Sequence, residues 1–300
     1  MDSRLCGNDG HDNKASAMTE LQSLLIEIGT EELPPKALDE LAAAFTRGIC
    51  EGLGKRGIAA GIASAKTYCS PRRLAVWIPE VAPSQPHQAQ GRRGPALAAA
   101  LDANGQPSRA LLGFAQSCGV DIAQLEKLET DKGAWFVHRT HKQGQSSAAL
   151  IPEIVVEALK ALPIPKPMRW GDHDYAFVRP AHWLVMTHGA EVVAGEILGL
   201  QSGRMSRGHR FHHPRPVHIA DADSWLEAMR AAHVLADPDE RRDRVRREIA
   251  RVAPDGATPH LSEALAAEIA NLTEWPVAIA CAFERDFLGG IEDRVRDLRP

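Results

Sequence analysis

The stretch LQSLLIEIGTEELPP (residues 21–35) sets the layout of the chain that follows it. Its first nine residues, LQSLLIEIG, are mostly apolar and end at a glycine, a pattern typical of a buried β-strand. Pro34 and Pro35 come next, and a helix can begin there because proline is tolerated in the first helical turn. Apolar residues then recur at helical spacing from 38 to 53 and two glycines follow, so we expect a long amphipathic helix.

Two more strands are expected after this helix, in residues 63–68 and 73–81, around a Ser-Pro turn. The resulting order β-α-β-β is that of a layered α/β unit with an antiparallel pair of strands. Residues 82–95 (APSQPHQAQGRRGP) are polar and rich in proline and glycine, which predicts a loop or linker. The expected fold class is therefore α+β.

The remaining elements are shorter and follow local signals. Ser108 is expected to cap a short helix that contains Leu111, Leu112 and Phe114. Periodicity predicts further helices in residues 147–162, 224–233, 239–252 and 261–272, and strands in 134–140, in much of 177–200 and in 275–283.

Three parts are expected along the chain. Residues 1–17 are polar and lack the apolar centre of a signal peptide, and a strand follows Met18 almost at once. We interpret residues 1–17 as a disordered extension and Met18 as the true start. Residues 18–220 are expected to form the layered α/β domain, and residues 221–300 a mainly helical segment.

Composition narrows the class of protein. The 300 residues carry a formal net charge of −4, so any nucleic-acid role must come from local basic patches. The 5 cysteines are scattered without a CxxC pair, which disfavours a disulfide framework and favours a reducing cytoplasm. No apolar run approaches 18 residues, so no membrane span is expected. The GxxxxGK[ST], GxGxxG and HExxH motifs are absent from the sequence.

Four arginine-centred segments stand out, and none contains a carboxylate: YCSPRRLAV (68–76), KPMRWG (166–171), FVRPAHW (177–183) and RMSRGHRFHH (204–213). Arginine binds phosphate through a planar fork of donors and stacks on bases, so these segments suit RNA. The candidate contacts to RNA phosphate or ribose are Arg72, Arg73, Arg169, Arg179, Arg204, Arg207, His209 and Arg210.

A structural role for these arginines is an open alternative. Alternation along a strand points Arg72 and Arg73 to opposite faces, so at most one should face the core. That one would need a carboxylate partner such as Glu27, Glu31 or Glu32. Arg169 and Arg179 have tryptophan and phenylalanine neighbours and could equally be guanidinium groups stacked in the core.

Catalytic and metal roles find little support in the sequence. His209, His212 and His213 are closely spaced, but no cysteine lies nearby and the surrounding arginines would repel a dication, so we expect no metal site. The pair Glu31 and Glu32 also suits the positive end of a helix, and Cys69 lacks a recognisable activating base. No catalytic residue is therefore assigned.

Taken in order, the segments resemble the beta subunit of the bacterial heterotetrameric glycyl-tRNA synthetase. The resemblance begins at LLIEIGTEELPP (24–35), runs through the segments at 68–76, 113–120 (GFAQSCGV), 166–171, 177–183 and 208–212, and ends near EWPVAI (274–279). It covers roughly residues 20 to 288.

The resemblance implies an α2β2 assembly that joins glycine to tRNA(Gly) with ATP and Mg. The alpha subunit would hold the class II aminoacylation site, and the beta subunit would bind tRNA and contact alpha. The N-terminal part is similar to the B3/B4 tRNA-editing-type domain of phenylalanyl-tRNA synthetase, and no cofactor, DNA or membrane is expected on this chain.

Two departures from the family pattern matter. The family's beta subunit is longer, with HD-type and anticodon-binding domains later in the chain, and the tail GGIEDRVRDLRP (289–300) no longer follows its pattern. We therefore expect a truncated N-terminal fragment that is inactive alone. Two alternatives stay open: an assembly module whose arginines are structural, and an editing-type hydrolase that uses Cys69 or Glu31.

Overall fold

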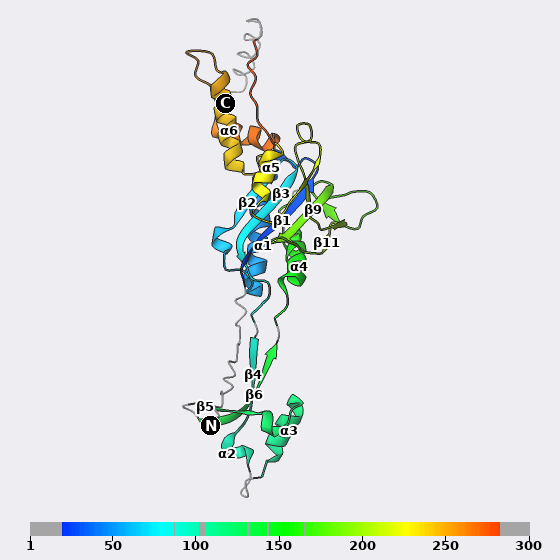
Figure 1. Cartoon of the computed structure of the whole chain (residues 1–300), viewed down its shortest axis with the longest axis vertical. Helices are drawn as coiled ribbons and strands as arrows, with labels where there is room; N and C mark the ends of the chain where they lie inside the picture. The colour runs from blue at the N-terminus through cyan, green and yellow to red at the C-terminus, as the bar shows by residue number, and fades with distance from the viewer. Residues whose placement is uncertain are drawn as a thin grey trace, which may run out of the picture.

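The computed structural model describes residues 20–282 except 87, 102–105, 131–132, 143 and 165, so the expected leader and the tail after 288 lie outside it. The described residues have the expected α+β class. A five-stranded antiparallel sheet with the strand order β10-β9-β1-β3-β2 forms the centre, and a three-stranded sheet β4-β6-β5 stands apart from it (Figure 1).

The central unit follows the β-α-β-β order predicted from residues 21–81. It comprises β1 (Gln22–Thr30), α1 (Pro35–Arg56), β2 (Lys66–Ser70) and β3 (Arg73–Val81), to which β9 (Ala181–His188) and β10 (Glu191–Val192) are added. Because β1 lies between β3 and β9 and both its faces are covered, its residues are buried continuously from Ser23 to Thr30 rather than alternately. Helix α1 ends as expected at Gly57, which adopts the left-handed conformation at φ 66°.

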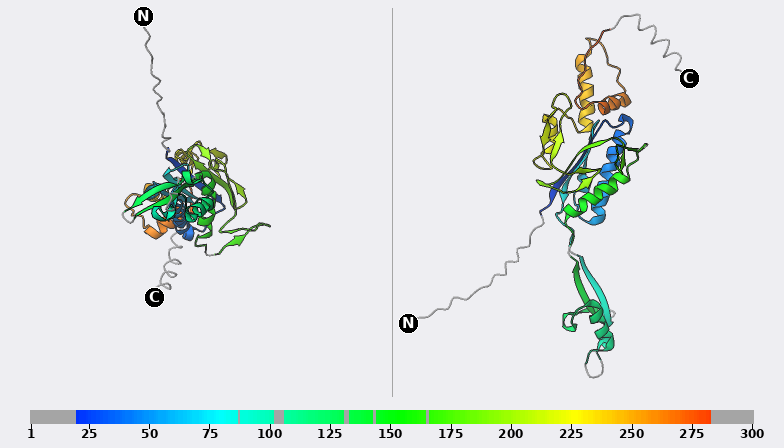
Figure 2. Two further views of the ribbon diagram at one scale, coloured as in Figure 1. Left: turned by 90° about the horizontal axis from the view of Figure 1, so that it is seen from below. Right: turned by 90° about the vertical axis from the view of Figure 1, so that its right-hand side faces the viewer.

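Helices and loops cover the two faces of the central sheet. Helices α1 and α4 (Ser147–Lys160) pack on one face, where Leu24, Ile26 and Ile28 of β1 point. On the other face Leu25 meets Trp225 and Met229 of α5 (Trp225–Ala231). The side view in Figure 2 shows the sheet between these layers.

A small lobe stands off this body on the paired strands β4 (Gln88–Ala96) and β6 (Gly133–Lys142) (Figure 1). It also contains α2 (Leu97–Ala100), α3 (Arg109–Cys118) and β5 (Glu126–Thr130), around a separate core of Ala100, Leu111, Ala115, Leu125 and Phe136. The predicted Ser108 cap is confirmed, since its Oγ accepts from Leu111 N.

The predicted loop at 82–95 is wrong from Gln88 onward, where β4 begins. Strand pairing joins backbone groups, so a polar segment rich in glycine can form a strand when a partner lies beside it. That partner is β6, which the sequence places more than 30 residues further along the chain, and local signals could not reveal it.

Short pieces complete the body. Between α4 and α5 the chain forms β7 (Met168–Arg169), β8 (Ala176–Phe177), β11 (Glu196–Ile197), β12 (Leu200–Gln201), β13 (Met205–Arg207) and β14 (Pro216–His218). After α5 come α6 (Pro238–Val252) and α7 (Glu263–Leu272), as periodicity predicted. Within the described part of the chain, no helix combines the length and apolar character needed to cross a bilayer.

The predicted strand at 275–283 is wrong over its described residues 275–282, which contain no strand. Their backbone groups bond to side chains of α6 instead: Arg244 and Arg251 donate to the carbonyls of Pro276 and Ala278, and Glu248 accepts from Ala278 N. An apolar run becomes a strand only beside another free strand edge. The division expected near residue 220 stays a prediction.

Candidate nucleic-acid interface

A buried ion-pair network joins the segments that the sequence singled out. Arg73 begins β3 and its Nη1 lies 2.8 Å from Oε1 of Glu27 on β1, with both side chains fully buried. Glu274 lies on the other side of these arginines: its Oε1 is 3.3 Å from Arg73 Nη2, and its Oε2 is 2.9 Å from Arg72 Nη2. Two guanidinium groups thus neutralise two buried carboxylates.

Three neutral side chains also donate hydrogen bonds to the Glu27 carboxylate. It accepts from the indole N–H groups of Trp183 on β9, at 3.1 Å, and Trp225 on α5, at 2.8 Å. The hydroxyl of Ser206 on β13 donates to it at 2.7 Å. A buried charge is tolerated only when it is paired and hydrogen-bonded, and this carboxylate has both kinds of partner. The network therefore locks β1, β3, β9, β13 and α5 together.

The burial of Arg72 corrects the expectation that at most one of the two arginines faces inward. Residues 71 and 72 form a turn before β3, so the alternation of a strand does not apply to Arg72. Its Nη2 also donates to Gly208 O at 2.8 Å. Burial acts to raise the pKa of Glu274, but the charges of Arg73 and Arg72 outweigh it and lower that pKa below its usual value.

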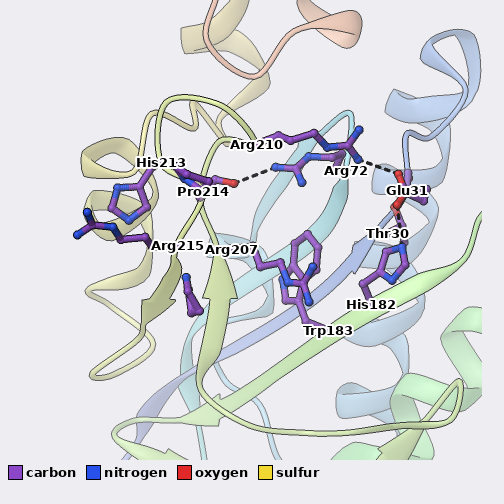
Figure 3. A pocket seen from close by; sticks show the side chains of 12 residues that line it. Thr30, Glu31, Arg72, His182, Trp183, Arg207, Arg210, His213, Pro214 and Arg215 are labelled. Atoms are coloured by element: carbon purple, nitrogen blue, oxygen red, sulfur yellow. Dashed lines mark hydrogen bonds and ion pairs between the residues drawn. The ribbon is translucent and has the colours of Figure 1, made fainter.

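A basic cleft of about 450 Å³ adjoins this network, and Figure 3 shows the side chains that line it. Arg72 and Trp183 belong to both the network and the cleft. The lining residues are Thr30, Glu31, Arg72, His182, Trp183, Arg207, Gly208, Arg210, His213, Pro214, Arg215 and Pro216. They include four arginines and two histidines against one carboxylate, which makes the cleft suited to an anion.

The one carboxylate in the cleft is Glu31, which lies between Arg210 and His182 (Figure 3). Its Oε2 is 2.8 Å from Arg210 Nη2 and its Oε1 is 2.9 Å from His182 Nε2. The hydrogen bond from Arg210 lowers the pKa of Glu31, so the group is ionised at neutral pH. Among the described residues, no carboxylate pairs with the exposed Arg207 or Arg215.

Close packing shapes the floor of the cleft. Gly29 on β1 pairs with Trp183, and a Cβ at this glycine would lie 1.8 Å from the indole Cε2. Only glycine therefore lets the indole lie across β1. The Trp183 ring is in cation–π contact with both Arg73 and Arg207, whose Cζ atoms are each 5.5 Å from its centroid.

A smaller hollow of about 210 Å³ adjoins the basic cleft and shares Arg72 and Arg210 with it. Its lining includes Phe211, whose side chain is 80% exposed, together with His209 and Trp275. Burial lowers the pKa of His209, which favours its neutral form.

The fold gathers five of the eight candidate residues and leaves three elsewhere. Arg72, Arg207 and Arg210 line the basic cleft, His209 lines the adjoining hollow, and Arg73 is buried beneath. By contrast, Arg169 is exposed on β7. Arg179 donates to Glu32 O at 3.0 Å, and Arg204 donates to Ala190 O at 2.8 Å and Ala220 O at 3.2 Å.

Sequence reasoning missed His182, His213 and Arg215 as lining residues and Glu274 as the second buried carboxylate. A usable signal existed for the first three, because each lies inside or beside one of the arginine-centred segments. Nothing near Glu274 in the sequence pointed to a partner some 200 positions away.

The geometry favours binding over covalent chemistry. Cys69 is buried in the core, where burial raises the pKa of its thiol, and it does not line the cleft. The described lining residues include neither serine nor cysteine, and the lowered pKa makes Glu31 a weak base. No cluster of metal-ligating side chains occurs among the described residues.

The described residues thus form an α+β body with a basic cleft next to a buried ion-pair network. The family model described as glycyl-tRNA synthetase beta subunit matches residues 24–289, and the chain belongs to that family. The resemblance drawn from the ordered segments is thereby confirmed.

Curated relatives agree with the family assignment. The chain is 49% identical over 272 residues to the glycine–tRNA ligase beta subunit of Xylella fastidiosa (strain 9a5c), covering 90% of the chain and 38% of that protein. It is 49% identical over 272 residues to that of Xanthomonas campestris pv. campestris (strain B100), covering 90% and 39%. It is 48% identical over 266 residues to that of Chromohalobacter salexigens, a match that covers 88% of the chain and 38% of that protein. The chain thus spans less than two fifths of the length of these relatives.

Proposed function

We propose that this chain contributes tRNA binding to a glycine–tRNA ligase, through the basic cleft. The observation that carries the proposal is the set of exposed guanidinium groups of Arg207, Arg210 and Arg215 around one hollow, in a chain whose net charge is −4. Guanidinium forks match phosphate oxygens, and a local patch is what an overall acidic chain needs to bind nucleic acid.

The wider setting of the proposal comes from the family. The chain would act in the cytoplasm beside an alpha subunit in an α2β2 assembly, with ATP, Mg and the aminoacylation of tRNA(Gly) assigned to alpha. Its body would be similar to the B3/B4 tRNA-editing-type domain. Arg169, exposed on β7, remains a second proposed phosphate contact, whereas Arg73, Arg179 and Arg204 direct their donors to protein groups.

The double change Arg207→Ala/Arg210→Ala is expected to weaken tRNA binding and to flatten its dependence on salt. Each lost phosphate contact should reduce the slope of log K against log salt by about 1. Equilibrium binding of tRNA to the full chain between about 50 and 200 mM salt measures both effects. Arg47→Ala/Arg109→Ala removes the same charge from two exposed helix positions and should change neither.

An unchanged affinity and salt slope in the Arg207/Arg210 variant would overturn the RNA role of the cleft. A specific observation supports docking of the alpha subunit as the second candidate function: Leu272, Val277 and Ile279, in the C-terminal part of the described residues, are 59%, 57% and 80% exposed, and the last two line one hollow. Co-purification with alpha that survives the arginine changes, together with absent tRNA binding, would favour that assembly role.

The change Glu31→Gln is expected to tighten tRNA binding about two- to fivefold, because it removes the nearer of the two carboxylates that pair with Arg210. The amide keeps the shape of the side chain and removes its charge. A titration of tRNA at fixed salt measures the effect, with Glu191→Gln on β10 as a control of equal charge change. Weaker binding than the unchanged chain would show that Glu31 helps to hold the ligand instead of competing with it.

A further inference from the structure

The loop at residues 208–213 has an ordered backbone although its tip is exposed. His209 Nδ1 accepts from Phe211 N at 3.2 Å and from His212 N at 3.1 Å, and His213 N donates to His209 O at 2.9 Å. His209 N is anchored to Ala232 O at 2.9 Å. The loop therefore presents the Phe211 side chain to solvent in one fixed place.

The surroundings of Phe211 combine aromatic rings with charged groups of both signs: Arg72 and Arg210 line the smaller hollow, and the carboxylates Glu274 and Glu32 that line it pair with these two arginines. The ring centroid of Phe211 is 6.2 Å from that of His209, which in turn is 4.5 Å from the ring of His212. Phe211 lines the smaller hollow, and Arg210 lines both that hollow and the basic cleft. An exposed aromatic ring thus lies beside a hollow that shares Arg72 and Arg210 with the basic cleft. Aromatic side chains next to a positively charged groove are the combination found where proteins bind single-stranded nucleic acid.

We propose that the two hollows bind an unpaired nucleotide of RNA, with its phosphate at Arg207 and Arg210 and its base stacked on Phe211. The inference rests on the proposed tRNA-binding function and names the part of the ligand that this site selects. In an A-form duplex the faces of the bases are stacked on one another, so only an unpaired, unstacked base can lie on the exposed ring. The site should therefore distinguish single-stranded from double-stranded RNA.

The test compares a labelled single-stranded RNA of about eight nucleotides with a duplex of the same sequence, both titrated onto the full chain. Phe211→Ala is expected to weaken single-strand binding about tenfold, and to leave duplex binding and the salt slope unchanged because no charge is lost. Phe211→Tyr, which keeps a ring, should restore single-strand affinity. Leu112→Ala, at a 51% exposed apolar position in the small lobe, serves as the matched control.

The outcomes separate this inference from the function on which it rests. Weaker binding in Arg207→Ala/Arg210→Ala but unchanged binding in Phe211→Ala would leave the phosphate surface in place and overturn base stacking. Equal affinity of the unchanged chain for single-stranded and duplex RNA would overturn it as well. Unchanged binding in the arginine variant would remove the proposed function itself. Thermal unfolding of each variant confirms that the fold is retained, as expected for a side chain that is 80% exposed.

Discussion

Arg73→Ala is expected to lower the free energy of unfolding by about 3–5 kcal/mol, because it leaves buried carboxylates without their main counter-charge. Glu27 and Arg73 are each fully buried, so water cannot replace the missing guanidinium. Glu274 would lose one of its two arginine partners, which would remove part of what keeps its pKa low. Every element that the network joins should therefore be destabilised.

Urea denaturation of the full chain followed by circular dichroism measures this effect. Arg47→Ala, an exposed change of equal charge, should stay within about 0.5 kcal/mol of the unchanged protein. If Arg73→Ala does not fold, Glu27→Gln gives the second measurement. It keeps an acceptor oxygen for the indole donors and removes the charge, so a measurable loss of stability is still expected. Unchanged stability in both variants would contradict the importance assigned to the network.

Arg241→Ala is expected to lower the free energy of unfolding by about 3 kcal/mol or more, since three buried carbonyls would lose a charged donor. Arg241 is a fully buried residue of α6. Its Nη1 donates to Cys69 O at 2.6 Å and to Leu235 O at 2.7 Å, and its Nε donates to Ala270 O at 2.6 Å. One guanidinium thus ties the α6–α7 pair to strand β2.

Arg241→Ala should also loosen the structure locally, in addition to lowering the global stability. Hydrogen exchange of the Leu235 amide, which donates to Glu274 O, is expected to accelerate because the segment carrying Glu274 is docked through the same contacts. Arg247→Ala, an exposed arginine on the same helix, is the matched control and should leave exchange unchanged. Slow exchange at Leu235 in Arg241→Ala would show that Glu274 is held independently of Arg241.

Elements with strong local signals were predictable. The apolar run of β1, the proline start and glycine end of α1, and the serine cap of α3 each depend on residues within one or two turns of one another. The two wrong predictions concern segments whose conformation depends on residues far away in the sequence. Strand β4 exists because β6 pairs with it, and residues 275–282 are not a strand because α6 side chains satisfy their backbone groups.

The same contrast applies to the candidate site. Arg207, His209 and Arg210 were recognisable as a basic segment without acidic neighbours, and the structure places them around two adjoining hollows. Arg73 was equally basic in the sequence but is buried against Glu27. A linear pattern shows which residues can bind phosphate, and only burial shows which of them are free to do so.

Residue patterns alone established the α+β class, the β-α-β-β start and the family, because these depend on local periodicity and on the order of segments along the chain. Folding decided the assignment of each arginine to the interior or to the cleft. The reason is the distance in sequence between partners: Glu27, Arg73, Ser206 and Glu274 meet in one buried cluster although some 250 positions separate the first from the last. The electrostatic environment of each group is set by these distant partners, so it exists only in the folded chain.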